Sequence, residues 1–267
     1  MKLDIDEYAH LRSPIHAWQP RYKLIGLGAL MFAVAMVETL WLVPVVMGLT
    51  ALLYGLSRIP WGYWLQRLRY PSFFLLGVIL VLPLMSGETV LWQWGPLTLR
   101  QEGCWAVVLI VGRFLSIITL SLLLFGTAPF LQTVKAMRSL GLPAILTDML
   151  LLSYRYLYEI ADQLLRMKQA MRLRGFGYAP TRRMPLIPQR RDLQVFASLA
   201  GTLLIRSYEQ SERVYQAMRL RGYGQARSPL AERDRPRLDT WSAIATGLSL
   251  TMAIALVAAD YWIGMKA

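Results

Sequence analysis

The chain has 267 residues, of which 55% are hydrophobic and only 17% charged, and its formal net charge is +13. Its single cysteine, Cys104, excludes an internal disulfide framework, and Cys104 with two histidines cannot form a zinc site from this chain alone. The basic residues form blocks between apolar stretches, which is typical of membrane proteins and not of a nucleic-acid-binding face. We therefore expect an integral membrane protein in a lipid bilayer, with no nucleic-acid partner.

Apolar segments in chain order predict about five transmembrane helices. Residues 24–56 carry one charge, Glu38, and as a single helix they would extend for about 50 Å, beyond a hydrocarbon core of about 30 Å. They are therefore expected to form two spans that turn near Glu38 and Pro44. Three further spans are expected at residues 73–85, 104–125 and 241–263. Arg113 lies inside the fourth, where we expect a structural role; a charge in a span can also mark a transport path.

Residues 127–239 carry too many charges to cross a membrane. A short amphipathic helix is expected at 128–140, ending at Gly141, followed by two long amphipathic helices separated by a linker at 179–188 with three prolines. Apolar and small residues recur along the long helices at three- and four-residue steps, which suits packing between them and also a partner interface that repacks. The predicted division is residues 1–125 with four spans, 126–237 with the long helices, and 238–267 with the last span.

A repeat marks the end of each long helix. Residues 169–177 read QAMRLRGFG, and residues 216–224 read QAMRLRGYG. A glycine cap with arginine in the last turn explains each end by itself, but it does not explain why the preceding residues are copied. We therefore predict that both ends dock on two copies of a cytoplasmic partner, through Arg172, Leu173, Arg174, Gly175, Arg219, Leu220, Arg221 and Gly222.

Motifs of catalysis are absent from the sequence. It has no phosphate-binding loop of the Gly-x-x-x-x-Gly-Lys type, no Gly-x-Ser-x-Gly elbow and no His-Glu-x-x-His helix. We predict no catalytic, cofactor or metal site, and hence a protein that is not an enzyme.

Four segments carry a resemblance to a known family. They are the N-terminal residues 5–24, the helix break Arg138-Ser139-Leu140-Gly141-Leu142-Pro143, and the tripeptides Leu173-Arg174-Gly175 and Leu220-Arg221-Gly222. The chain resembles the transmembrane T component of energy-coupling factor (ECF) transporters, most closely the CbiQ type that serves cobalt or nickel uptake. The family has Ala-Arg-Gly in place of the two tripeptides, so the first position differs here.

The resemblance implies a non-catalytic, multi-pass subunit of the cell inner membrane. By resemblance, Arg174 and Arg221 insert into grooves of two ABC ATPase subunits, and the same helices support a separate substrate-binding S component. The substrate would be cobalt or nickel; the alternatives are a vitamin such as biotin, or a stand-alone permease or enzyme.

The distribution of basic residues predicts a topology. Residues 1–23, 58–69 and 127–239 hold 26 of the 29 Lys and Arg, and the opposite side holds only Arg100 and Lys266. Because basic loops stay in the cytoplasm, a tag between residues 179 and 188 should be accessible only from inside, and a tag after residue 267 only from outside. Protease protection in oriented vesicles measures both. A cytoplasmic tag at residue 267 would contradict five spans with a cytoplasmic N-terminus.

Overall fold

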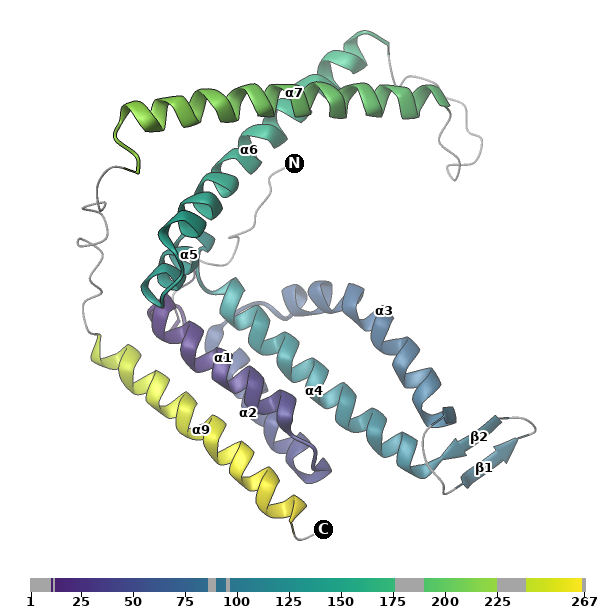
Figure 1. Ribbon diagram of the computed structural model, residues 1–267. Helices are drawn as coiled ribbons and strands as arrows, with labels where there is room; N and C mark the ends of the chain where they lie inside the picture. Colours follow the sequence, from purple (N-terminus) through teal and green to yellow (C-terminus); the bar gives the residue numbers. More distant parts are fainter. Residues whose placement is uncertain are drawn as a thin grey trace. The chain divides into compact units, whose positions relative to one another are not determined.

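A computed structural model describes residue 11 and residues 13–85, 90–94, 97–175, 190–224 and 239–265 (Figure 1). The chain divides into two units. The first comprises residues 1–147 and 238–267, and the second comprises residues 148–237. Helices dominate both units, which confirms the prediction of an all-α membrane protein.

Seven helical elements and a short hairpin make up the described part of the first unit. They are α1 (Pro20–Met36), the 3-10 helix η1 (Leu40–Leu42), α2 (Val43–Ser57), α3 (Trp61–Met85), β1 (Val90–Trp94), β2 (Leu97–Arg100), α4 (Gln101–Gly126), α5 (Phe130–Ser139) and α9 (Thr240–Gly264). Helix α6 (Ala144–Leu173) begins in this unit and continues into the second, which also contains α7 (Arg190–Leu220).

The predicted turn between the first two spans is present. Helix α1 ends at Met36. Val37 has an extended backbone conformation and leads the chain toward η1. Asp260 of α9 holds this turn, because its carboxylate accepts hydrogen bonds from the backbone N–H groups of Glu38 and Thr39 at 2.9–3.2 Å and from the Thr39 hydroxyl at 2.7 Å. The turn is therefore fixed by the last helix of the chain, some 220 residues away in sequence.

The core of the first unit surrounds α1, which packs against α9, α4 and α5. Its fully buried side chains come from both ends of the sequence and include Leu27, Leu30, Val34, Leu120 and Leu123. Small residues let α1 and α9 approach closely. A side chain at Gly26 would clash with the hydroxyl of Ser249 and the ring of Trp18. Lipid chains are as apolar as leucine, so close backbone approach and hydrogen bonds must hold such helices together.

Hydrogen bonds reinforce the contact between α1 and α9 where both helices begin. The Trp18 indole N–H donates to the Thr246 hydroxyl at 3.1 Å. The backbone N–H of Gln19 donates to the Ser242 hydroxyl, also at 3.1 Å. On the other side of α1, the buried Lys23 ammonium donates to the Thr127 hydroxyl at 2.8 Å. The start of α1 is thereby tied both to α9 and to the connection between α4 and α5.

Helix α3 differs from the expected short span. It extends from Trp61 to Met85 and bends by 48° between the parts Trp61–Phe73 and Leu75–Pro83. Much of segment 58–69, which was assigned only to the basic side, is therefore helical. Pro71 and Pro83 both lie inside this helix, where proline removes a backbone donor and weakens the preceding turn.

A β-hairpin joins α3 to α4, and the sequence analysis missed it. Strands β1 and β2 pair antiparallel, with Trp92 opposite Leu99 and Trp94 opposite Leu97. The sequence signal was present, because residues 90–94 and 97–100 are rich in β-formers and flank a Gly-Pro pair. Trp92 and Trp94 both belong to β1.

Three helical segments among the described residues are long and apolar enough to cross a membrane: Leu40–Ser57, Gln101–Gly126 and Thr240–Gly264. The two bent parts of α3 qualify as a fourth when taken together. Helix α1 has 17 residues. At about 1.5 Å per residue it is somewhat shorter than a hydrocarbon core of about 30 Å. The total of five spans stays a prediction.

Close packing at Gly26 yields a test with a control in the same helix. We expect Gly26→Leu to destabilise the protein by about 1–3 kcal/mol, because overpacking forces α1 away from α9. Gly28→Leu should change little, since a side chain there meets nothing within 4 Å. Thermal unfolding in detergent measures both variants. Equal losses at the two positions would show that α1 and α9 do not approach closely at Gly26.

Candidate coupling-helix ends

The second unit presents the two copies of the repeat at the ends of two helices of almost equal length. Helix α6 has 30 residues and ends at Leu173, and α7 has 31 residues and ends at Leu220. Both have one apolar face, which confirms the prediction of two long amphipathic helices.

The two helix ends have the same backbone geometry. Gly175 has φ +81° and Gly222 has φ +79°, a left-handed conformation that glycine adopts without steric cost. The Gly175 amide donates to the Arg172 carbonyl and the Gly222 amide to the Arg219 carbonyl, each at 3.0 Å. In the second copy, Tyr223 N–H also bonds the Met218 carbonyl at 3.0 Å, which completes a Schellman cap. The glycines therefore act as helix caps, which is one of the two roles that the sequence analysis considered for the repeat.

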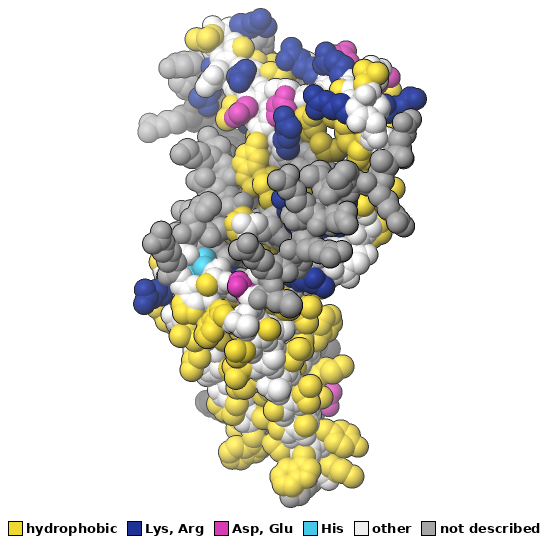
Figure 2. Space-filling model, turned by 90° about the vertical axis from the view of Figure 1, so that its left-hand side faces the viewer, with side chains coloured by type: hydrophobic (Ala, Val, Ile, Leu, Met, Phe, Trp, Pro, Cys, Tyr) yellow, Lys and Arg dark blue, Asp and Glu magenta, His cyan; other side chains and the backbone are white. Residues whose placement is uncertain are grey.

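Capping does not account for the side chains around the glycines. Leu173 and Leu220 are each 90% exposed, and Arg174 and Arg221 are exposed beside them. An exposed leucine alone carries no information, but the same leucine–arginine pair is presented twice with one backbone geometry. The candidate residues Arg172 and Arg219 are also exposed, and the Arg219 guanidinium lies 5.9 Å from the centre of the Tyr215 ring. Figure 2 shows Lys and Arg side chains gathered on the helices of this unit.

Much of the apolar face of each long helix is uncovered within the unit. Contact between α6 and α7 is limited to their crossing, where the Gln163 side chain donates to the Gln210 side chain at 3.4 Å (Figure 1). Of the predicted stripes, Leu157 on α6 and Phe196 and Leu204 on α7 are about half or more exposed. The stripes therefore do not serve mainly to pack the two helices on each other.

A second contact joins the repeat of α7 to the beginning of α6. The Tyr223 hydroxyl donates to the Asp148 carboxylate at 3.0 Å. Tyr223 is the one position at which the two copies differ, since the first copy has Phe176, which lies outside the described residues. Phenylalanine has no hydroxyl, so only the second copy can form this bond. The sequence analysis noted the exchange of aromatics but had no means to find Asp148 as its partner.

Arg113 lies near the middle of α4, and Glu38 lies in the turn between α1 and η1; these are the two charges noted in the apolar segments. Arg113 is half-buried and interacts electrostatically with Asp260, the residue that holds the α1–η1 turn. It lines a cavity of about 10 Å³ with Val34, Val43 and Gly112, which is too small for a substrate. Glu38 is exposed. These contacts support the structural role that we expected for Arg113.

Comparison with known proteins places the chain in a family. Residues 12–230 match CbiQ, described as "Cobalt transport protein". The chain belongs to the CbiQ family. The match covers most of the sequence, including both copies of the repeat, and confirms the resemblance stated above.

Several relatives carry the names of transporter membrane components. The chain is 28% identical over 195 residues to the cobalt transport protein CbiQ of Salmonella typhimurium, covering 68% of this chain and 83% of that one. It is 30% identical over 132 residues to the energy-coupling factor transporter transmembrane protein EcfT of Ruminiclostridium cellulolyticum, covering 49% of each chain. It is 34% identical over 141 residues to EcfT of Thermotoga maritima, covering 51% of this chain and 49% of that one. The chain thus spans about half the length of these two EcfT relatives.

These relatives place the protein among the membrane components of ECF and cobalt transporters. The described residues contain no group of three or more His, Cys, Asp or Glu side chains that could hold a metal ion.

The bond between Tyr223 and Asp148 makes the two copies of the repeat unequal. We expect Tyr223→Phe to release the end of α7, so that amide hydrogen exchange of residues 218–224 becomes about threefold faster, in keeping with the modest net strength of an exposed hydrogen bond. Asp148→Ala should have the same effect.

Tyr208→Phe on the exposed surface of α7 removes a hydroxyl elsewhere and serves as the control. Hydrogen–deuterium exchange with mass spectrometry reports on all three variants. Unchanged exchange in both Tyr223→Phe and Asp148→Ala would show that the bond does not order the second repeat.

Proposed function

We propose that this CbiQ-family protein is the energy-coupling T subunit of an ECF-type importer. Arg174 and Arg221 each dock in a groove of one cytoplasmic ABC ATPase subunit, and α6 and α7 transmit the closure of the ATPase pair to a substrate-binding S component. The protein itself is non-catalytic. It resides in the inner membrane with a cytoplasmic N-terminus.

The observation that carries this proposal is the identity of the two helix ends. Two equal docking grooves require two equal ligands, and here the residues, the left-handed glycines and the exposed leucine–arginine pairs agree between α6 and α7. Arginine suits such a groove, because its planar guanidinium offers five donors that match carboxylates and carbonyls.

The transported substrate follows from the family and not from a site in this chain. The family is described as cobalt transport, and the Salmonella relative is named a cobalt transport protein. We therefore propose cobalt, or nickel with the same ligand preferences, bound by the S component. The relatives named EcfT leave a vitamin-loaded S component as the alternative.

A stand-alone permease is the competing function, and it needs a polar path through the spans. Among the described residues of the three segments that are each long enough to cross a membrane, the charged side chains are Glu102 at the exposed start of α4, Arg113 and Asp260, and the last two interact electrostatically. The cavity beside Arg113 holds no more than a water molecule. These features support a coupling role over independent transport.

Charge reversal at the motifs tests the proposal. We expect Arg174→Glu or Arg221→Glu to weaken association with the ATPases by about 2–5 kcal/mol and to abolish uptake, because each leaves a partner group buried and unpaired. Both variants should still insert and fold in the membrane. Arg174→Lys and Arg221→Lys, which keep the charge but lose the planar fork, should have intermediate effects.

Arg182→Glu, in the linker between the helices, makes the same change of charge and is the matched control. The measurement is co-purification of ATPase subunits with the tagged chain, together with ⁵⁷Co uptake in cells. Equal losses in the linker and motif variants would mean that diffuse electrostatics holds the ATPases, and the docking proposal would be wrong.

A further inference from the structure

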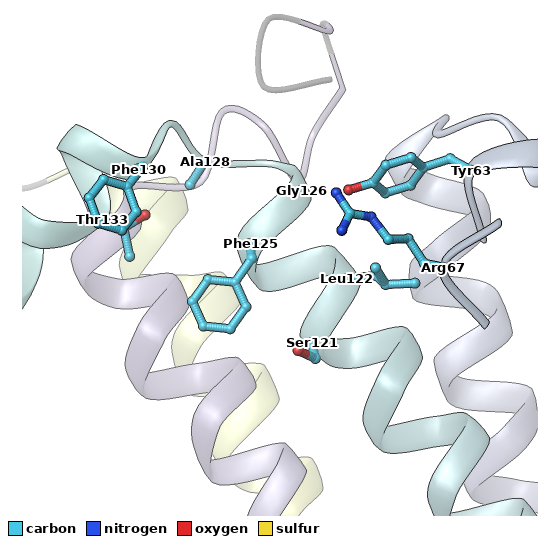
Figure 3. A pocket seen from close by; sticks show the side chains of 9 residues that line it. All are labelled: Tyr63, Arg67, Ser121, Leu122, Phe125, Gly126, Ala128, Phe130 and Thr133. Atoms are coloured by element: carbon cyan, nitrogen blue, oxygen red, sulfur yellow. The ribbon is translucent and has the colours of Figure 1, made fainter. Parts of the chain in front are cut away.

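A cavity of the first unit lies where α3, α4 and α5 meet, at the end of α4 (Figure 3). Its volume is about 300 Å³. Side chains of α3 form one wall and those of α5 the opposite wall, with α4 between them. The lining residues are Tyr63, Arg67, Ser121, Leu122, Phe125, Gly126, Ala128, Phe130 and Thr133.

One wall of the cavity carries a positive charge. The Arg67 guanidinium lies 5.4 Å from the centre of the Tyr63 ring, a cation–π contact that orients the side chain. In Figure 3 the guanidinium points toward Gly126 at the end of α4. No carboxylate lines the cavity among the described residues, so no acidic group there neutralises the arginine. A phosphate is the anion that best matches the paired donors of a guanidinium.

The neighbouring surface is apolar. In Figure 3, Leu122 of α4 lies just below the arginine, and Phe125 of the same helix lies on the side of Thr133 and is 60% exposed. A free anion gains nothing from such a surface, whereas a hydrocarbon chain next to the phosphate would bury it. The combination therefore fits a molecule with a phosphate and an attached apolar chain.

The cavity also lies at the expected depth for a lipid headgroup. Helix α4 qualifies as a membrane span and ends at Gly126, which lines the cavity. The first part of α3 carries Arg67 and Arg69 together with the exposed aromatic residues Trp61 and Tyr70. Aromatic and basic side chains gather where the bilayer meets water. The bend of 48° in α3 separates this part from the apolar part that follows.

We propose that this cavity binds the headgroup of an anionic phospholipid. Arg67 holds the phosphate, and the first carbons of an acyl chain lie along Leu122 and Phe125. A cavity of about 300 Å³ admits a phosphoglycerol group, but it does not admit a helix of a partner protein. Because α5 forms one wall and leads directly into α6, the bound lipid would stabilise the base of the first coupling helix.

Native mass spectrometry of the delipidated full chain tests the proposal. With added phosphatidylglycerol, the wild-type chain should retain one bound lipid. Phosphatidylcholine should bind more weakly, because its choline cation finds no carboxylate in the cavity lining. Arg67→Gln should weaken phosphatidylglycerol binding about tenfold, in keeping with the loss of charge-assisted hydrogen bonds. Arg69→Gln makes the same change of charge two residues away, does not line the cavity, and should bind as the wild type does.

A second variant, Ser121→Phe, fills the apolar part of the cavity without changing its charge and should also weaken binding. Thermal unfolding confirms that each variant is folded. Equal losses in Arg67→Gln and Arg69→Gln would overturn the proposal in favour of a diffuse basic surface. Displacement of the lipid by excess inorganic phosphate would replace it with a free-anion site, and undiminished binding by Ser121→Phe would move the lipid elsewhere.

Discussion

The exclusion of charge from the hydrocarbon core is the constraint on which the rest of this structure depends. A charged side chain at the centre of a bilayer costs about 2.5–3.5 kcal/mol even on the most lenient scale. The chain therefore confines its charges to a few segments and leaves α2, α4 and α9 nearly free of them. This separation gives one unit of apolar helices and a second unit in which α6 and α7 carry charge along one face and apolar side chains along the other.

The same constraint determines how the first unit is held together. Since lipid competes equally for apolar side chains, α1 relies on close approach at Gly26 and on hydroxyl groups of α9. Gly112 of α4 has the same function opposite Val43 of α2, because a side chain there would clash with the valine. Two charged side chains of this unit that are buried or half-buried interact with polar groups: Lys23 donates to Thr127, and Arg113 interacts electrostatically with Asp260.

Patterns that lie within one segment were predictable from the sequence, and contacts between distant segments were not. Hydrophobic length identified α4 and α9 almost to the residue, and the repeat located both helix ends with their glycine caps. Helix α3, with its internal prolines, and the hairpin at β1 and β2 had local signals that the sequence analysis did not use. Asp260 and Asp148 could not have been found, because their partners are some 220 and 75 residues away and no pattern connects them.

Transmission by two helices that end in the same motif requires those ends to move relative to each other when the ATPases close. Arg166 and Arg213 are suitable label positions, since both are exposed about two turns before the ends of their helices and neither belongs to the docking residues. The most direct measurement is the distance between spin labels at these two positions in the assembled complex, by double electron–electron resonance, without nucleotide and with ATP bound. A coupling role predicts that ATP changes this distance. The same distance in both states, with the ATPases bound, would contradict it.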